Sequence, residues 1–124
     1  MQYFLTVPHD SAEEPTMESM QEIDPAELEA VLKAVDAFNT ALKDAGAFRF
    51  AAGLQPPSTA KTVDASGGDV LVLDEPFVEA ASYVGGFWVI EAADEAEALR
   101  WTTMAAQALG GRIEVRALQE APSE

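Results

Sequence analysis

The 124-residue chain contains no cysteine, one histidine, seven basic residues and no long apolar run. Without cysteine it has no disulfide bond, no thiolate metal ligand and no cysteine nucleophile, a composition that fits a reducing compartment. No stretch approaches the roughly 18 apolar residues of a membrane helix. The segment Met1 to Val7 lacks the basic and apolar regions of a signal peptide. We therefore expect a cytoplasmic protein with no membrane partner.

Positive charge is scarce as well. The chain has 22 acidic residues and a formal net charge of -15. Its basic residues are scattered along the sequence: Lys33, Lys43, Arg49, Lys61, Arg100, Arg112 and Arg116. Because phosphate backbones and anionic lipids are bound by clustered cations, we expect no nucleic-acid partner and no membrane surface. The paired glycines match neither a Walker nor a dinucleotide spacing, so no cofactor is expected.

Hydrophobic periodicity predicts one domain over residues 1–118, followed by a tail at 119–124. One helix is predicted from Pro25 to Ala45, and a second starts after Asp94 and stops at Gly110. Each start has an aspartate that can cap the helix and a glutamate three residues later that can complete a capping box. The predicted strands are Gln2–Val7, Ala47–Gly53, Thr59–Val63, Asp69–Leu73, Phe87–Ala92 and Arg112–Leu118, and His9–Ile23 is predicted to be a surface loop.

This order of elements predicts an α+β fold of the split βαβ, ferredoxin-like type. Both helices should cover one face of an antiparallel sheet. The strand Phe87–Ala92 is apolar on both alternating sets of side chains, so the other face also needs a cover. A second copy of the chain is the simplest cover. We therefore expect a homodimer that encloses a cavity between two facing sheets.

Three segments together resemble the YCII-related family, in its branch marked by an Asp-Gly-Pro-Phe loop. They are Gly53–Val63, then Asp74–Glu79 with Gly85–Glu91, and then Glu97–Trp101 with Gly111–Arg116. The resemblance implies a ferredoxin-like, dimeric α+β barrel. Most of this branch is uncharacterised, and some relatives are encoded beside extracytoplasmic-function sigma factors.

Two departures from the family pattern bear on function. Glu75 stands where the loop has glycine, which adopts positive φ more readily than glutamate. Many relatives carry a histidine in the first helix that is proposed to act with an aspartate. The resemblance aligns that histidine with Val35 and the aspartate with Asp44. The resemblance therefore implies that the dyad is missing here.

The candidate catalytic residues are His9 and Asp74. His9 follows the first strand and is a candidate general base or ligand, or else a solvated loop histidine. Asp74, Glu75 and Glu79 form an acidic loop that could polarise a substrate or hold a divalent cation. The alternative is that Asp74 caps the turn at Pro76 and the two glutamates are solvated. Our prediction assigns no metal site.

Charged residues are predicted on the sheet face away from the helices: Arg49, Glu91, Glu114 and Arg116. The prediction assumes that Phe48 and Phe50 both face the helices, which turns Arg49 the other way. Arginines in such a cavity could grip a carboxylate, or the charges could form salt bridges between strands or protomers.

Phe87, Trp88 and Trp101 are candidates for the wall of a ligand pocket, with the core or a dimer contact as the alternative. Three functions remain open from the sequence. The first is a homodimeric barrel that binds a small ligand or partner through Arg49, Phe87, Trp88, Glu91 and Arg116. The second is a small-molecule enzyme that uses His9 or the Asp74 loop as acid or base. The third, a regulatory interaction module, rests on the resemblance alone.

Overall fold

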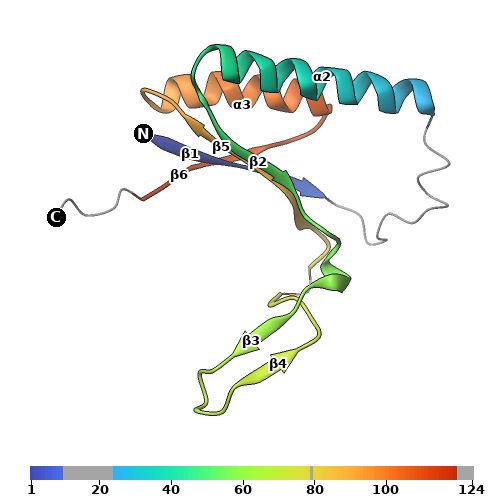
Figure 1. Ribbon diagram of the computed structural model, residues 1–124, viewed down its shortest axis with the longest axis vertical. Helices are drawn as coiled ribbons and strands as arrows, with labels where there is room; N and C mark the ends of the chain where they lie inside the picture. Colours follow the sequence, from blue (N-terminus) through green and yellow to red (C-terminus); the bar gives the residue numbers. More distant parts are fainter. Residues whose placement is uncertain (10–23, 79, 120–124) are drawn as a thin grey trace.

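The computed structural model describes residues 1–9, 24–78 and 80–119. Two helices lie on one face of a four-stranded sheet, and a two-stranded sheet extends away from this body (Figure 1). Within the described residues, no helix is long and apolar enough to cross a membrane. The elements are β1 Gln2–His9, α2 Pro25–Asp44, β2 Phe48–Gly53, the 3-10 turn η1 Pro57–Thr59, β3 Thr62–Asp64, β4 Leu71–Leu73, β5 Tyr83–Glu91, α3 Glu95–Leu109 and β6 Glu114–Ala117.

The main sheet has the strand order β2-β5-β1-β6, and each neighbouring pair is antiparallel. The first and third of these strands in chain order, β1 and β5, therefore lie in the centre of the sheet, and β2 and β6 form its edges, as in a ferredoxin-like fold. Helices α2 and α3 pack side by side over one face (Figure 1). The predicted α+β, ferredoxin-like architecture is confirmed. The predicted loop 10–23, Glu79 and most of the predicted tail lie outside the described residues.

Both helices begin where the capping residues were predicted. The Asp24 carboxylate accepts a hydrogen bond from the backbone N–H of Ala26 at 2.9 Å. At the second helix, the Asp94 carboxylate accepts from the N–H of Glu97 at 2.8 Å. The Glu97 carboxylate reaches back to the N–H of Ala93, one residue before the cap. The αL conformation of Gly110, with φ of 67°, ends α3.

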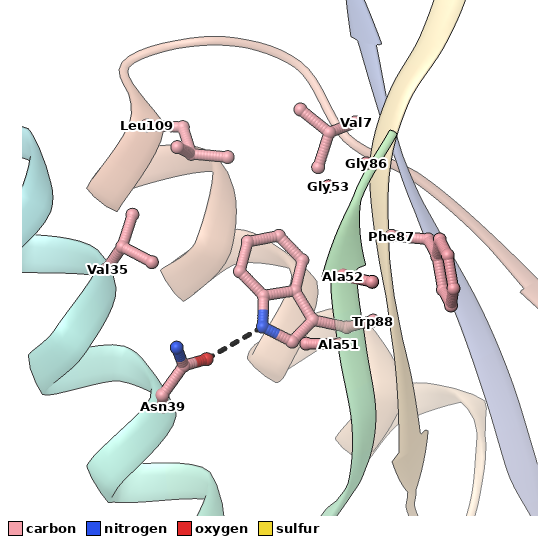
Figure 2. A pocket seen from close by; sticks show the side chains of 10 residues that line it. All are labelled: Val7, Val35, Asn39, Ala51, Ala52, Gly53, Gly86, Phe87, Trp88 and Leu109. Atoms are coloured by element: carbon pink, nitrogen blue, oxygen red, sulfur yellow. Dashed lines mark hydrogen bonds between the residues drawn. The ribbon is translucent and has the colours of Figure 1, made fainter. Parts of the chain in front are cut away.

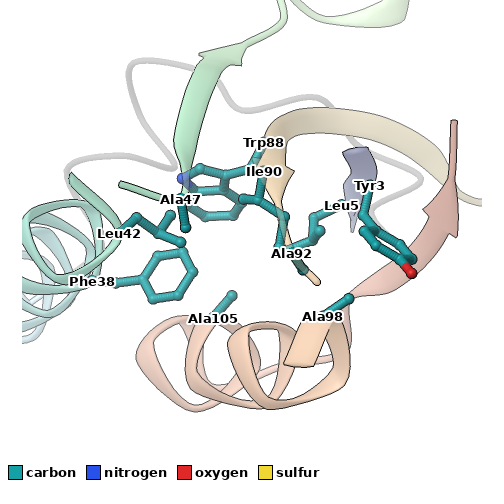
Figure 3. Packing of buried hydrophobic residues seen from close by; sticks show 10 residues of the cluster. All are labelled: Tyr3, Leu5, Phe38, Leu42, Ala47, Trp88, Ile90, Ala92, Ala98 and Ala105. Carbon is teal, nitrogen blue, oxygen red and sulfur yellow. The ribbon is translucent and has the colours of Figure 1, made fainter. Parts of the chain in front are cut away.

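The core lies between the helices and the sheet (Figure 3). Leu5, Leu42 and Ile90 are fully buried, and Phe38 packs its ring edge-on against Trp88. The apolar stripe of α2 is buried only in its C-terminal half. Leu32, in the N-terminal half, is 60% exposed. The reason is length, because α2 has 20 residues against 15 in α3 and extends beyond it (Figure 1).

Three local predictions differ from the structure. The first strand was expected to end before Pro8, yet β1 continues to His9 because the pairing with β5 shifts register between Val7 and Pro8. Phe50 was expected to face the helices, and this is wrong. The pairing of β2 with β5 shifts between Phe48 and Phe50, so Phe48 lies opposite Ile90 and Phe50 opposite Val89. A β-bulge of this kind reverses the alternation of side chains beyond it.

The strands predicted at 59–63 and 69–73 are the third difference. They shorten to β3 and β4, which pair with each other as a separate two-stranded sheet. The Pro56–Pro57 dipeptide explains the later start of β3, and the turn that continues through Asp69 delays the start of β4. The dipeptide starts the 3-10 turn, which occupies the first residue of the predicted strand.

Candidate functional site

The face of the sheet opposite the helices carries a row of aromatic rings. We call this surface, on β2, β5, β1 and β6, the open face. The Phe87 ring stacks on Phe4 with centroids 5.2 Å apart and lies 5.8 Å from the Phe50 ring. Phe50 remains 57% exposed. Three strands thus contribute one phenylalanine each to a continuous aromatic surface that no element of this chain covers within the described residues.

At the β2 edge of the open face, Glu91 meets two cations. Its carboxylate accepts from the ammonium of Met1 at 2.6 Å and lies 3.8 Å from the Arg49 guanidinium. The hydrogen bond from the Met1 ammonium lowers the pKa of Glu91. Desolvation opposes this shift, and the charges of the ammonium and of Arg49 lower the pKa further. Arg49 also donates to the backbone oxygens of Gly46 and Phe48. Arg49 and Glu91 are therefore neighbours, and Arg49 also contacts the backbone next to it.

Arg116 and Glu114 lie at the opposite edge of the open face. By register Arg116 is opposite Phe4 and Glu114 is opposite Thr6, while Val115 packs on the core. Both charged residues are exposed. With β5 and β1 between β2 and β6, the two arginines are separated by roughly 14 Å across the sheet at ~4.8 Å per strand. Arg49 and Arg116 of one protomer therefore cannot grip the same small carboxylate.

Trp88 points the other way, into the space between α2 and the sheet. Figure 2 shows its indole at a pocket of about 340 Å³, with Phe87 directed to the opposite side of the sheet. The indole N–H donates to the Asn39 side-chain oxygen at 2.8 Å. The structure thus divides two residues that sequence reasoning had assigned to one ligand site. Asn39 was missed, although a buried tryptophan generally requires an acceptor for its N–H.

Val35 lines the same pocket one helical turn before Asn39 (Figure 2). The position where relatives carry a histidine is therefore an apolar wall beside the indole. Asp44 lies nine residues further along α2, or roughly 14 Å along the helix axis at ~1.5 Å per residue. Even a histidine at position 35 would not reach Asp44 of the same chain.

A broad groove of about 1420 Å³ lies between the two connections that link the main sheet to β3 and β4. Asp74 and Glu75 are among its lining residues. The Asp74 carboxylate pairs with the Lys61 ammonium at 2.6 Å, and the Thr62 hydroxyl donates to the backbone oxygen of Glu75. Asp74 is thus an ion-pair partner, which differs from both of its predicted roles. Glu79 lies outside the described residues.

His9 lies at the end of β1, beside the start of β5. Its ring is tilted against Tyr83 with centroids 5.5 Å apart, and it passes over Gly85 so closely that a Cβ there would lie 2.6 Å from the imidazole. Tyr83 lines the groove that also contains Asp74. In the described part of the chain, no group of three or more acidic or histidine side chains is gathered closely enough to hold a metal ion.

The comparisons with known proteins agree with this architecture. One family's sequence model, described as the YCII-related domain, matches residues 1–121. The match spans both helices, all the strands and the two connections that border the groove. A search of curated proteins found no match.

Proposed function

This chain belongs to the YCII-related family, and from that premise we propose that it works as a homodimeric barrel that binds a small ligand between two facing sheets. The observation that supports the proposal is the uncovered aromatic row of Phe4, Phe50 and Phe87. A sheet with helices on one face is stable when its second apolar face is also removed from water. A second copy of the same face provides that cover with two-fold symmetry.

The energy available from this contact is substantial. Phe50 alone is 57% exposed, which leaves on the order of 120 Å² of its surface in water and corresponds to about 3 kcal/mol at ~25 cal/mol per Å². The two-fold axis doubles this contribution. The net charge of -15 on each copy opposes association. At about 0.15 M salt this repulsion is screened beyond roughly 8 Å.

The chemistry of the open face favours a flat, largely apolar ligand with an acidic group. Aromatic rings provide stacking surface, and the exposed Arg116 guanidinium at the β6 edge offers a bidentate partner for a carboxylate. At the other edge of the face, Arg49 already forms an ion pair with Glu91. We therefore assign ligand contact to Phe87 and Arg116, and an ion-pair role to Arg49 and Glu91.

Native mass spectrometry of freshly purified protein tests this proposal. We expect a dimer that carries additional small-molecule mass. Phe50→Asp should yield monomers, whereas Leu99→Asp, which puts the same charge at a 48%-exposed position on α3, should remain dimeric. Arg116→Ala should keep the dimer and lose the bound mass. A monomeric wild type, or a dimer unaffected by Phe50→Asp, would contradict the proposed interface.

A second proposal is an acid–base enzyme that uses His9 or the Asp74 loop. The observation in its favour is the groove of about 1420 Å³, which is lined by Asp74 and by the Tyr83 ring that His9 contacts. The two candidates do not form a pair, because Asp74 binds Lys61 and His9 packs on Tyr83 and Gly85. If the mass found on the protein is converted to a product on incubation, His9→Ala and Asp74→Asn should each slow the conversion. Unchanged rates would remove this proposal.

A further inference from the structure

The two-stranded extension makes little contact with the rest of its own chain. We call residues 54–78, which include β3 and β4, the arm. Its two strands pair with each other and not with the main sheet, and Figure 1 shows them far from the helices. The Lys61–Asp74 ion pair and the Thr62–Glu75 hydrogen bond that join its sides are both exposed. A two-stranded ribbon held by exposed contacts is marginal in water.

The arm exposes apolar side chains in place of the polar ones expected on a free hairpin. Val63 and Val72 are directly opposite each other and are 64% and 65% exposed. Phe77 is 89% exposed. The other large apolar side chains that are more than half exposed in the arm are Leu54, Val70, Leu71 and Val78. Together these seven present on the order of 700 Å² of apolar surface. It is divided between the two faces of the ribbon, because Leu71 points away from the face that Val63 and Val72 share.

This apolar surface is continuous with the open face. The register shift in the β1–β5 pairing places Val84 opposite Pro8, on the same side of β5 as Phe87. Val84 is 43% exposed, and it lies at the base of the arm beside Leu54, whose N–H donates to the backbone oxygen of Gly85. Val84 therefore gives a partner that covers Phe50 and Phe87 an apolar contact on the way to the arm.

The charges around the arm disfavour two polyanionic occupants, nucleic acid and anionic lipid. Lys61 is its one cation and is already paired, while Asp64, Asp69, Asp74 and Glu75 are acidic. Nucleic acid and anionic lipid are repelled by such a surface. A second copy presents the same apolar surface, and a two-fold axis makes each arm contact occur twice.

We propose that the arm packs on a second copy of this chain, so that Val63 and Val72 of each protomer are buried by the partner. The arm and the open face then form one interface. This inference rests on the proposed homodimer and adds a second, separable contact to it. The groove at the base of the arm, which includes Asp74 and Tyr83, then borders the dimer interface.

Sedimentation equilibrium at about 0.15 M salt tests the arm separately from the open face. We expect Val72→Asp to weaken the dimer by at least about tenfold. Its control is Ala65→Asp, which adds the same charge at the exposed turn of the same arm and should change the dissociation constant less than about threefold. Equal effects of the two substitutions would overturn the inference while leaving the dimer intact. A wild type that is monomeric throughout would instead refute the proposed homodimer.

A second measurement does not depend on how Val72→Asp folds. Because the chain has no cysteine, Val72→Cys and Ala65→Cys each introduce a single thiol. We expect alkylation at position 72 to slow by about tenfold or more as the concentration is raised through the dimer range, with position 65 unchanged. If both thiols of a dimeric protein react equally fast, the arm is open to solvent or to a different partner, and the inference is wrong.

Discussion

Replacing Asn39 with alanine tests the polar contact inside the apolar pocket. Trp88 is only 6% exposed, and its indole N–H donates to the Asn39 oxygen at 2.8 Å. An orphaned buried donor costs about 1–3 kcal/mol. The adjacent pocket of about 340 Å³ can admit water, which favours the lower half of that range. Alanine also gains roughly 0.5 kcal/mol of helix propensity within α2. The net expected loss is therefore about 0.5–1.5 kcal/mol.

Thr40→Ala is the matched control. Thr40 is exposed on the same helix, and its intrinsic helix propensity is close to that of asparagine, so this change gains propensity without touching the indole. Urea unfolding followed by circular dichroism, at one fixed protein concentration, should place Asn39→Ala about 1–2 kcal/mol below Thr40→Ala. In a Trp88→Phe background, which has no indole donor, this gap should close. A gap that is absent in the wild-type background, or unchanged by Trp88→Phe, would refute the reasoning.

Three further predictions concern packing and charge. Ile90, which is fully buried, should lose about 2–5 kcal/mol on truncation to alanine and about 0.5–1.5 kcal/mol on truncation to valine in urea unfolding. Gly86→Ala should lower the melting temperature more than Gly85→Ala. The new Cβ at Gly86 would lie 3.1 Å from a fixed backbone oxygen of β2, whereas at Gly85 it meets the exposed His9 ring, which can rotate away. Glu91→Gln should be less stable than the wild type near neutral pH. The pKa of Glu91 is lowered, so its contribution is complete above the ordinary value of 4.5 and is lost as pH falls through the lowered value. Thermal unfolding from pH 6 downward should therefore show the difference disappear below pH 4.5.

Each of these has a contradicting result. Equal losses for the two Ile90 variants would mean that the site collapses around the missing methyl groups. A melting temperature lower for Gly85→Ala than for Gly86→Ala would show that the His9 ring is held in place. A Glu91→Gln difference that stays constant as pH falls through the lowered pKa would show that the carboxylate charge is not its source.

The elements that sequence reasoning placed correctly are those governed by local chemistry. The caps at Asp24 and Asp94 and the stop at Gly110 are each set by hydrogen bonds or dihedral angles within one turn. The alternation of Glu114 and Arg116 with Val115 was also predictable, because β6 pairs with β1 without a bulge. Local rules suffice where the register is regular.

Contacts between distant segments decided the features that were missed. No residue near Phe50 in the sequence indicates the β-bulge that turns the Phe50 side chain to the open face. The same holds for the separate pairing of β3 with β4. It also holds for the hydrogen bond between Trp88 and Asn39, which are 49 positions apart in the sequence. At the site, the sequence placed Arg49 and Glu91 on one sheet face without pairing them, and the Lys61–Asp74 ion pair depends on the geometry of the arm.

The extra residue at Arg49 reverses the alternation of side chains along the rest of β2. Before it, Phe48 packs toward the core; after it, Phe50 faces outward. If Arg49 paired regularly, it would lie opposite Val89 and Phe50 opposite Trp88, so the second phenylalanine would change sides together with everything up to Gly53. The unpaired residue therefore determines whether the outer face is aromatic. A single-residue insertion or deletion in 50–53 should be tolerated far less well than a substitution, because it would exchange the exposed and buried sides of the strand beyond it.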